Sequence, residues 1–448
     1  MNYKETVEYL YSRLPMFSKQ GSSAIKKDLA NTVLLCNSLN NPQERFKSIH
    51  IAGTNGKGSV SHMLASVLQV AGYKTGLYTS PHLRDFRERI RINGQMIAEA
   101  DIINFVQEQR DLIDTISPSF FEVTVAMAFD YFAAQEVDIA VIEVGLGGRL
   151  DSTNIINPIL SIITNISFDH VSILGNSLKE IAAEKSGIIK KGIPVVIGEA
   201  INEVVKKVFE DKAQQQYSTL TLASESWLIK NNKDSNEDVL SLEVSKPSNT
   251  NLQADAVIQV KPPLSDGSES LNLSLDLTGT YQLKNLKTVL SAIEQLRLIG
   301  FSITNEQIQS GLSQVTKLTG LMGRWQILDH NPLIICDTGH NEDGIQEVIK
   351  NIARISYHTL HMVIGMVKDK DITKVLSLLP KEARYYFCNP AIERAKPALD
   401  LAKEAEAAGL SGESYSSVHE ALLAAKANAN MNDFIFIGGS TYVVAEII

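Results

Sequence analysis

The sequence has few cysteines and no long apolar run. Its three cysteines, Cys36, Cys336 and Cys388, are far apart, lack metal-ligand spacing and leave one thiol over in any pairing scheme. We therefore expect no disulfide framework and a reducing, cytoplasmic compartment. The N-terminal residues MNYKETVEYL carry charge early, and no stretch approaches the roughly 18 consecutive apolar residues of a membrane helix. We expect neither export nor a membrane partner.

A surplus of basic residues is also missing. The chain has 42 lysines and arginines against 51 aspartates and glutamates, which gives a net charge of −9. Nucleic acids and anionic membranes are bound by an excess of Lys and Arg, so this balance argues against both partners. The composition, 44% hydrophobic and 21% charged, is typical of a soluble globular enzyme. An anionic ligand must therefore meet a local group of positive charges.

The apolar pattern predicts two α/β domains. At 448 residues the chain exceeds one domain of roughly 100 to 200 residues. Short runs rich in Val and Ile alternate with amphipathic stretches, which predicts a parallel sheet wrapped by helices. The N-terminal series comprises Ser48–Ala52, Val60–Val70, Asp138–Val144, Ile159–Thr164, Leu178–Ile189 and Val195–Ile197. The C-terminal series comprises Pro332–Cys336, Leu360–Gly365, Tyr385–Cys388 and Phe434–Ile437.

A polar segment separates the two series. Residues 231–256 are rich in Asn, Asp and Ser, and a pair of prolines follows at 262 and 263, as in loops that join short strands. We expect a β-rich insertion at about 217–277. The predicted domains are 1–320 and 321–448, with the boundary near Thr319–Gly323.

A glycine-rich loop, GTNGKGS, follows the first predicted strand and precedes a predicted helix. In this order, glycines let backbone N–H groups turn toward phosphate oxygens, the helix N-terminus adds its dipole, and a lysine adds a point charge. The spacing differs from that of the common phosphate loop, because Gly58 separates Lys57 from Ser59. We predict a nucleotide site formed by Gly53, Asn55, Gly56, Lys57, Gly58 and Ser59.

Polar residues also follow the next predicted strands. Glu143 ends the run Asp138–Val144, and His170 comes shortly after Ile159–Thr164. Ligands of open α/β sheets bind at the carboxyl ends of strands, and a carboxylate there can hold Mg²⁺. The alternatives are a charge at a strand end for Glu143 and a structural histidine for His170. By composition alone, Lys185 is a solvated lysine on a helix.

Four arginines cluster in the segment HLRDFRERIRING, at positions Arg84, Arg87, Arg89 and Arg91. Residues 88–94 alternate like a strand that enters a turn, so the arginines can form a solvated sheet edge. They can also bind a carboxylate-bearing substrate, because the guanidinium group pairs with a carboxylate through two hydrogen bonds. We favour a role at a substrate or an interface.

Ten motifs, in this order along the chain, resemble one family. They are HIAGTNGKGSV, YTSPHL, ERIRING, FFEVTVAMAF, EVGLGGRLDSTN, NISFDH, AEKSGIIKKG, LTGTYQLKN, MGRW and ICDTGHN. Together they are similar to motifs of folylpolyglutamate synthases and bifunctional dihydrofolate synthases of the Mur ligase superfamily. The resemblance covers nearly the whole chain. It implies an α/β fold with an N-terminal P-loop ATPase domain of Mur ligase type, which carries the β-rich insertion, and a C-terminal Rossmann-like domain.

The resemblance also implies where substrates bind. It places the ATP phosphates on Asn55 to Ser59 and adds nucleotide contacts from Asn285, Arg324 and Asp337 around the domain junction. Dihydropteroate would contact residues of three segments, namely His82, Ser119, Phe120, Phe121, Glu122, Leu150, Asp151 and Ser152.

Two magnesium ions are implied as well. The first would lie on Ser80 and Glu143, although the general logic of phosphate loops would choose Ser59. The second would lie on His170 and Lys185, because the family carbamylates this lysine with CO₂ and so turns a cation into an anionic oxygen donor. The resemblance thus reverses the solvated interpretation of Lys185 and implies Lys57, His170 and Lys185 as catalytic residues.

Three positions depart from the family pattern. Tyr281 stands where many members have His, Thr338 and Gly339 replace a Gly-Ala pair, and Glu342 follows Asn341 where Pro is common. None of these departures removes a charged catalytic group.

The family implies a monomer that uses ATP to join L-glutamate to dihydropteroate, to a folate or to both, through an acyl phosphate. Two other functions fit a phosphate loop. A Mur-type ligase of cell-wall precursors is disfavoured by the TSPHL and ERIRING segments. A nucleotide-dependent switch would leave Lys185, His170 and the second domain unexplained.

Overall fold

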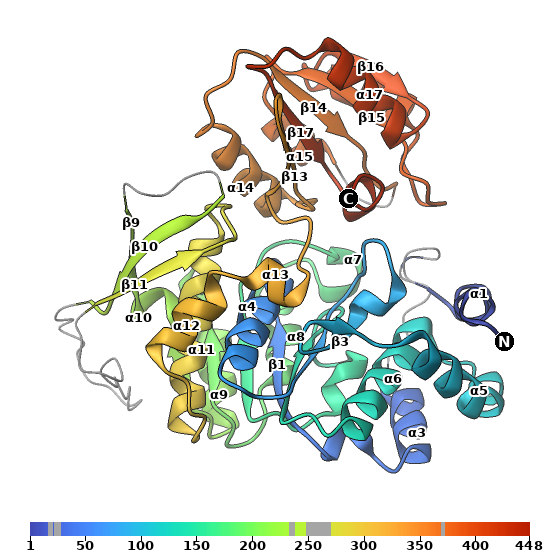
Figure 1. Ribbon diagram of the computed structural model, residues 1–448, viewed down its shortest axis with the longest axis vertical. Coiled ribbons are helices and arrows are strands. Elements are labelled where there is room, and N and C mark those ends of the chain that lie inside the picture. The colour runs from blue at the N-terminus through green and yellow to red at the C-terminus, as the bar shows by residue number, and fades with distance from the viewer. Residues whose placement is uncertain (17–20, 22–27, 233–237, 248–269, 369–371) are drawn as a thin grey trace. The chain divides into compact units, whose positions relative to one another are not determined.

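The computed structural model describes residues 1–448 except 17–20, 22–27, 233–237, 248–269 and 369–371. The chain divides into two compact units (Figure 1). Unit 1 comprises Met1–His82, Phe86–Asp276 and Gln282–Leu321, and unit 2 comprises Leu83–Asp85, Leu277–Tyr281 and Met322–Ile448. None of the helices in the described parts is both long and apolar enough to cross a membrane.

An eight-stranded sheet of order β4-β3-β2-β5-β1-β6-β7-β8 forms the centre of unit 1. Its strands are β1 (Lys47–Ala52), β2 (Thr75–Tyr78), β3 (Ile90–Ile92), β4 (Gln95–Met96), β5 (Ile139–Glu143), β6 (Leu160–Ile163), β7 (Val195–Ile197) and β8 (Leu220–Leu222). The predicted parallel pairing is confirmed from β2 to β8. Outside that predicted series, β3 lies in the segment 88–94 that was predicted as a strand entering a turn, and it pairs antiparallel with β2 and β4. A two-residue turn joins β3 to β4, and a parallel pair needs a longer crossover.

Helices of unit 1 surround this sheet, whose central strands are buried along their lengths, as parallel strands usually are. The helices are α1 (Tyr3–Arg13), α3 (Ala30–Ser38), α4 (Lys57–Val70), α5 (Glu99–Ile116), α6 (Phe120–Ala134), α7 (Val171–Leu174), α8 (Leu178–Lys185), α9 (Glu203–Gln215), α10 (Ala223–Ser226), α11 (Gln282–Leu298), α12 (Asn305–Leu312) and α13 (Val315–Thr319). Helix α4 packs against α11 and α12, and α6 packs against α3 and α5. The predicted helix Leu178–Ile189 ends earlier, at Lys185, and continues as one 3₁₀ turn.

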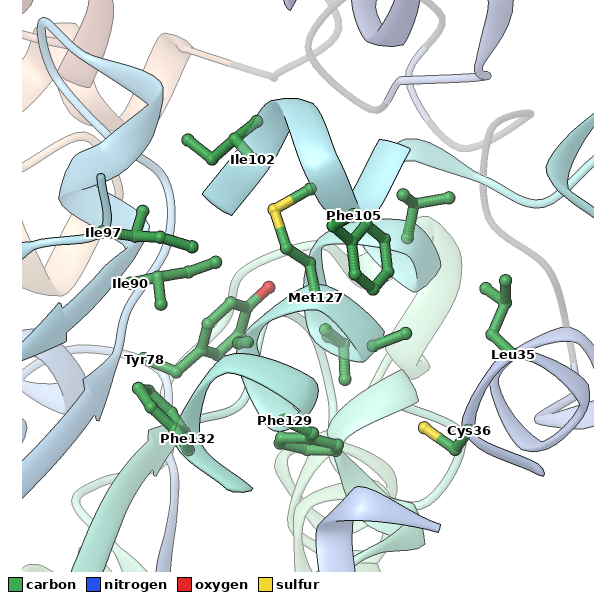
Figure 2. Packing of buried hydrophobic residues seen from close by; sticks show 14 of the residues in the cluster. Leu35, Cys36, Tyr78, Ile90, Ile97, Ile102, Phe105, Met127, Phe129 and Phe132 are labelled. Carbon is green, nitrogen blue, oxygen red and sulfur yellow. The ribbon is translucent and has the colours of Figure 1, made fainter. Parts of the chain in front are cut away.

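Aromatic side chains of α6 fill the core beside β2 and β5. Phe129 and Phe132 are fully buried in one cluster with Tyr78 of β2 and Phe105 of α5 (Figure 2). Gly76 of β2 leaves room for Phe132, because a Cβ at this position would lie 3.0 Å from its ring. This packing fixes β5 and, with it, the position of the carboxylate at its end.

The predicted β-rich insertion contains a three-stranded antiparallel sheet of order β11-β10-β9. Its strands are β9 (Leu228–Asn231), β10 (Leu240–Ser245) and β11 (Ser270–Leu275). The strand-rich segment begins later than predicted, since Leu220–Leu222 pairs with β7 in the main sheet. The rest of the predicted insertion, 233–237 and 248–269 with its proline pair, lies outside the described residues.

Unit 2 is built on a six-stranded sheet of order β12-β13-β17-β14-β15-β16. Its strands are β12 (Gln326–His330), β13 (Leu333–Cys336), β14 (Leu360–Ile364), β15 (Arg384–Cys388), β16 (Gly412–Tyr415) and β17 (Phe434–Gly438), and its helices are α14 (Glu342–Ile352), α15 (Thr373–Leu378), α16 (Ala398–Ala407), α17 (Val418–Asn428) and α18 (Thr441–Ala445). All four predicted apolar runs form strands here. Only β12 pairs antiparallel, at the sheet edge, so the unit is a mainly parallel α/β fold.

Candidate active site

The candidate site lies at the carboxyl end of β1. This strand pairs with β5 on one side and with β6 on the other, so the residues that follow all three strands meet at one edge of the sheet. The glycine-rich loop leaves β1 at Gly53, and α4 begins at Lys57. The predicted order of strand, loop and helix is confirmed, and the loop lies where open α/β sheets bind ligands.

Two glycines of this loop allow close approach by neighbouring side chains. Gly56 has a φ of +83°, and a Cβ on it would lie 2.3 Å from Oδ1 of Asn285. Gly53 has a φ of +147°, and a Cβ there would lie 1.8 Å from Oγ1 of Thr164. Any other residue at these positions would strain the backbone and collide. The loop is therefore a shaped backbone cradle, as phosphate binding requires.

Residues that follow β6 hold the loop in place. The backbone N–H of Asn55 donates to Oδ1 of Asn165 at 2.8 Å, and the Thr164 hydroxyl donates to the Asn55 carbonyl at 2.5 Å. Thr54 N–H donates to the Asn165 carbonyl at 3.0 Å. We did not predict Thr164 or Asn165 as site residues, although their position after a strand was the same signal that identified Glu143.

Two lysines meet at one backbone carbonyl of the loop. Nζ of Lys57 donates to the carbonyl oxygens of Gly53 at 3.1 Å and Thr54 at 3.0 Å. Nζ of Lys185, at the end of α8, donates to the same Gly53 oxygen at 2.7 Å. Lys185 is only 3% exposed, so the interpretation of a solvated helical lysine is wrong. Burial, and then the charge of Lys57, lower the pKa of Lys185 to about 7.

Glu143 and Ser80 lie together beside the loop. The Glu143 side chain is buried, and its Oε2 accepts a hydrogen bond from the Ser80 backbone N–H at 3.3 Å. A carboxylate and a hydroxyl supply the oxygen ligands that Mg²⁺ prefers. His170 follows β6 in a left-handed conformation, with Nε2 3.8 Å from Oδ2 of Asp169. Asp169 acts on the pKa of Lys185, which indicates that this segment faces the lysine.

The predicted metal ligands do not form a ready-made cluster of side chains. Within the described part of the chain, no three side chains of His, Cys, Asp or Glu come together at a point that could hold a metal ion. Ser80 with Glu143 suits a metal that keeps water or phosphate oxygens as its other ligands, as Mg²⁺ usually does. His170 with an unmodified Lys185 does not suit a cation, because an ammonium group has no lone pair to offer.

Of the residues predicted to bind dihydropteroate, His82 and Phe120 lie in one aromatic cluster. Arg89 Nε donates to His82 Nδ1 at 2.7 Å, and the guanidinium carbon lies 5.2 Å from the Phe120 ring centre. The Tyr11 hydroxyl lies 3.3 Å from His82 Nε2. Arg89 and Arg91 are each 7% exposed, so the solvated-edge interpretation is wrong for both. We did not predict Tyr11, since nothing in the sequence connects α1 with this cluster.

Three other predicted substrate residues make hydrogen bonds to the chain itself. Ser119 and Glu122 form the capping box of α6, in which Glu122 Oε2 accepts from the Ser119 N–H at 2.6 Å. Asp151 is buried, which raises its pKa, and its carboxylate accepts from the N–H groups of Leu146 at 2.8 Å and Thr153 at 3.0 Å. These side chains shape the loops of the site. The remaining predicted members are the partly buried Phe121, the exposed Leu150 and the buried Ser152.

In unit 2, Asp337 and Arg324 belong to one hydrogen-bonded group. Asp337 Oδ2 accepts from the Tyr281 hydroxyl at 2.6 Å and from the Trp325 N–H at 2.8 Å. Arg324 donates to the hydroxyl of Thr338. Burial raises the pKa of Asp337, and burial with the Asp337 charge holds the pKa of Tyr281 well above its usual value. Two departures from the family pattern, Tyr281 and Thr338, thus lie directly against the two predicted nucleotide contacts of this unit.

The third departure from the family pattern, Glu342, contacts neither Arg324 nor Asp337 through the ion pair that it forms. Glu342 opens α14 and forms an ion pair of 3.7 Å with Lys374 on the same unit. Both side chains are exposed enough for such a pair to add little stability. With Glu342 in place of the family's Pro, α14 still begins directly after Asn341, whose side chain caps it.

Both units match domains of the Mur ligases. The Mur ligase middle domain matches residues 51–293, and the Mur ligase glutamate ligase domain matches residues 323–441. The fold and the loop at the end of β1 thus define a Mur-type ligase. Enzymes of this class form carbon–nitrogen bonds, and the chain is such an enzyme.

Relatives narrow the class to one family. The chain is 30% identical over 457 residues to the folylpolyglutamate synthase of Lacticaseibacillus casei, covering 100% of this chain and 98% of that protein. It is 32% identical over 452 residues to a probable bifunctional folylpolyglutamate synthase/dihydropteroate synthase of Haloferax volcanii. That match covers 100% of this chain but only 50% of the longer protein.

Solved structures agree with the relatives. E. coli FolC in complex with DHPP and ADP has a TM-score of 0.83 and 28% identity, with 100% of this chain and 97% of that chain covered. The bifunctional folylpolyglutamate synthase/dihydrofolate synthase of Yersinia pestis with AMPPNP and Mn ion has a TM-score of 0.79 and 27% identity, covering 100% and 97%. The chain therefore belongs to the folylpolyglutamate synthase family of the Mur ligase superfamily.

The buried Lys185 predicts a pH dependence of stability in buffer free of CO₂ and metal ions. Its pKa is about 7 in the folded chain and near the ordinary 10.5 when unfolded. Between these values the unfolded state holds the proton and the folded state does not, so the free energy of unfolding rises with pH. The contribution is at most about 1.4 kcal/mol per pH unit. Denaturant titrations from pH 7 to 10 should show this rise in the wild type and a flatter profile for Lys185→Met; equal slopes would contradict it.

Proposed function

We propose that the chain uses ATP to join L-glutamate to dihydropteroate, to tetrahydrofolate or to both, releasing ADP and phosphate. The observation that carries the proposal is the convergence of Lys57 and Lys185 on the Gly53 carbonyl, beside the carboxylate of Glu143. Two amino groups at one backbone oxygen favour an anion next to them, and the loop offers its N–H groups to phosphate. The relatives, which are folylpolyglutamate synthases, and the ADP and DHPP bound to FolC support the same substrates.

An acyl phosphate is the intermediate of the proposed reaction. An amine cannot displace oxide from a free carboxylate at a useful rate, so ATP must first activate the carboxylate. Transfer of the γ-phosphoryl group does so and accounts for ADP and phosphate as products. The amino group of glutamate then attacks the carbonyl carbon, and phosphate leaves with the bonding electrons. The loop from Asn55 to Ser59 would hold the transferring phosphate in line with the carboxylate, since phosphoryl transfer is catalysed mainly by positioning and electrostatics.

The oxygen atoms of Glu143 and Ser80 fit a first Mg²⁺ beside the loop. When bound, this ion would neutralise the charge that develops on the phosphate oxygens and help to align them. Ser59 is less suited to the same role, because the Gln282 side chain donates to its hydroxyl at 3.2 Å and leaves it a single lone pair, whereas Glu143 offers a carboxylate. The arrangement favours the assignment that the family resemblance implies over that of general phosphate-loop logic.

Lys185 fits the carbamate that the family resemblance implies. Carbamylation joins the neutral amine to CO₂, forms one N–C bond and releases one proton, so it requires an unprotonated lysine. With a pKa of about 7, roughly half of Lys185 is in that state at neutral pH. The carbamate would be an anion near Lys57. It would provide the oxygen donor that the unmodified lysine lacks, and His170 would add a ring nitrogen. The second Mg²⁺ site therefore depends on this modification.

The aromatic cluster around His82 suits a flat heteroaromatic substrate. Tyr11 and His82 are partly exposed and provide ring faces, whereas Phe120 is buried beside Tyr11 with the buried Arg89 guanidinium over its ring. A pteridine ring stacks well on such side chains, and an arginine can pair with a substrate carboxylate. Leu150, Asp151, Ser152 and Ser119–Glu122 would form the loops around this ligand. Arg324 and Asp337 are proposed nucleotide contacts, held within unit 2 by Thr338 and Tyr281.

A turnover assay tests the proposed function. Purified protein should consume ATP only when L-glutamate, Mg²⁺ and either dihydropteroate or tetrahydrofolate are all present, and product masses should rise in steps of one glutamate. Running the two acceptors in parallel identifies one or both activities. Excess EDTA should abolish turnover.

Three results of this assay would contradict the proposal. Amide formation with UDP-muramyl substrates but not with pterins would identify a cell-wall ligase. ATP hydrolysis that depends on a protein partner and not on glutamate would identify a switch. Release of AMP and pyrophosphate would exclude the acyl phosphate.

Carbon NMR tests the modification of Lys185. Protein equilibrated with ¹³C-bicarbonate should show one carbamate resonance that is lost in Lys185→Met. Lys190→Met is a matched control, because Lys190 is also partly buried with a lowered pKa and donates to a backbone carbonyl at 2.9 Å. It should keep the resonance. A wild type without a carbamate signal that turns over fully in CO₂-free buffer would contradict the modification.

A further inference from the structure

Gln282 opens α11 and is a fully buried polar side chain beside the phosphate loop. Its Nε2 donates to Oγ of Ser59 at 3.2 Å, and its Oε1 accepts from Nδ2 of Asn285 at 2.8 Å. The side-chain amide thus joins the first turn of α4 to the residue that faces Gly56. Neither the sequence patterns nor the family resemblance singled out Gln282.

These two bonds set the orientation of both partners. An amide has one donating and one accepting end, so Gln282 cannot turn over without leaving a buried donor facing the donor of Asn285. Asn285 donates with its nitrogen and directs Oδ1 toward Gly56, where a Cβ would lie 2.3 Å from this oxygen. The bond between the two amides therefore couples their orientations, because neither side chain can turn over alone without losing it.

The bond to Ser59 also decides how its hydroxyl can act. A serine hydroxyl has one hydrogen to donate and two lone pairs to accept. Gln282 fills one lone pair of the Ser59 oxygen, which leaves the hydrogen for another acceptor and one lone pair open, and Ser59 is a buried residue, 1% exposed. A phosphate oxygen on the loop is such an acceptor, and hydrogen bonds to charged acceptors are the stronger ones.

We infer that Gln282 is a positioning residue of the nucleotide site, which orients the Ser59 hydroxyl as a donor to phosphate and fixes Asn285 against the loop. The inference rests on the proposed function, because it requires a nucleotide on Gly53–Ser59. It goes further in making the orientation of Ser59 and Asn285 toward the nucleotide depend on a residue of α11. Preorganised donors of this kind bind without the cost of reorienting when the ligand arrives.

Substitutions on one helix separate this role from a structural one. Gln282→Met keeps the length of the side chain and removes both hydrogen bonds. Gln295→Met is the matched control, because Gln295 lies on the same helix and its Nε2 donates to the Thr221 hydroxyl at 3.2 Å, away from the loop. Ser59→Ala and the double variant Ser59→Ala/Gln282→Met complete a double-mutant cycle. The readouts are the Kd of Mg–ADP by calorimetry, KM and kcat for ATP, and Tm.

Gln282→Met should raise the Kd of Mg–ADP and the KM for ATP about ten-fold, since without both hydrogen bonds Ser59 and Asn285 are no longer held in the orientation that binds the nucleotide. The KM for glutamate should stay unchanged. Gln295→Met should change the Kd by about two-fold or less while lowering Tm as a lost hydrogen bond does. Because Gln282 acts partly through Ser59, the double variant should lose much less than the product of the two single losses.

The inference would be overturned if Gln282→Met bound Mg–ADP within two-fold of the wild-type affinity. It would also be overturned if the affinity losses of Gln282→Met and Ser59→Ala simply multiplied in the double variant. If Gln282→Met does not fold, Gln282→Glu keeps size and polarity but has no N–H to donate to Ser59. It should also weaken Mg–ADP binding about ten-fold, and an unchanged Kd would overturn the inference. A wild type that binds no Mg–ADP would instead refute the proposed function.

Discussion

The structure of the site depends on the Gly53 carbonyl oxygen, which accepts hydrogen bonds from Lys57 and Lys185 at 3.1 Å and 2.7 Å. One lysine comes from the helix after the loop and the other from α8, more than a hundred residues later. Two charged ammonium groups so close together repel each other, and burial adds to the penalty on the charged form of Lys185. A neutral amine, an anion between the lysines or a carbamate each relieves this repulsion. The pKa of Lys185, lowered first by burial and then by the charge of Lys57, and the proposed carbamate chemistry both relate to this contact.

Much of the fold could be predicted from local patterns. The runs at 48–52, 138–144, 159–164 and 195–197 became β1, β5, β6 and β7, because short Val-rich and Ile-rich segments with helices between them can only be buried as a parallel sheet. The alternating segment 88–94 became β3, as predicted, whereas β4 was not foreseen, since its pairing follows from the turn at Asn93–Gly94 and not from apolar content. Leu220–Leu222 was assigned to the insertion because its pairing with β7 is a long-range contact that its composition does not reveal.

For the site, too, local patterns predicted some residues and could not predict those whose position depends on long-range packing. Gly53–Ser59 and His170 follow predicted strands and Glu143 ends one, so the sequence pattern alone predicted that they lie at one edge of the sheet, since parallel strands bring their carboxyl ends together. Lys185 could not be found by pattern, since its burial depends on how α8 packs against the loop, and only the resemblance identified it. Tyr11 and Gln282 were missed for the same reason, because His82 and Ser59 lie 71 and 223 positions away from them in sequence and polar residues of this kind have no periodic signal. Asn165 carried the same signal as His170, a position after a predicted strand, but was not singled out.

The central claim is that a phosphoryl group held by this loop passes to a substrate carboxylate before the amide forms. The most direct test is to label both oxygens of the acceptor carboxylate with ¹⁸O and to analyse the released phosphate by mass spectrometry. Direct transfer predicts that each amide formed leaves a single ¹⁸O atom in one molecule of inorganic phosphate. Unlabelled phosphate accompanying amide formation would contradict the account, because it would mean that the carboxylate oxygen never bonded to the γ-phosphorus.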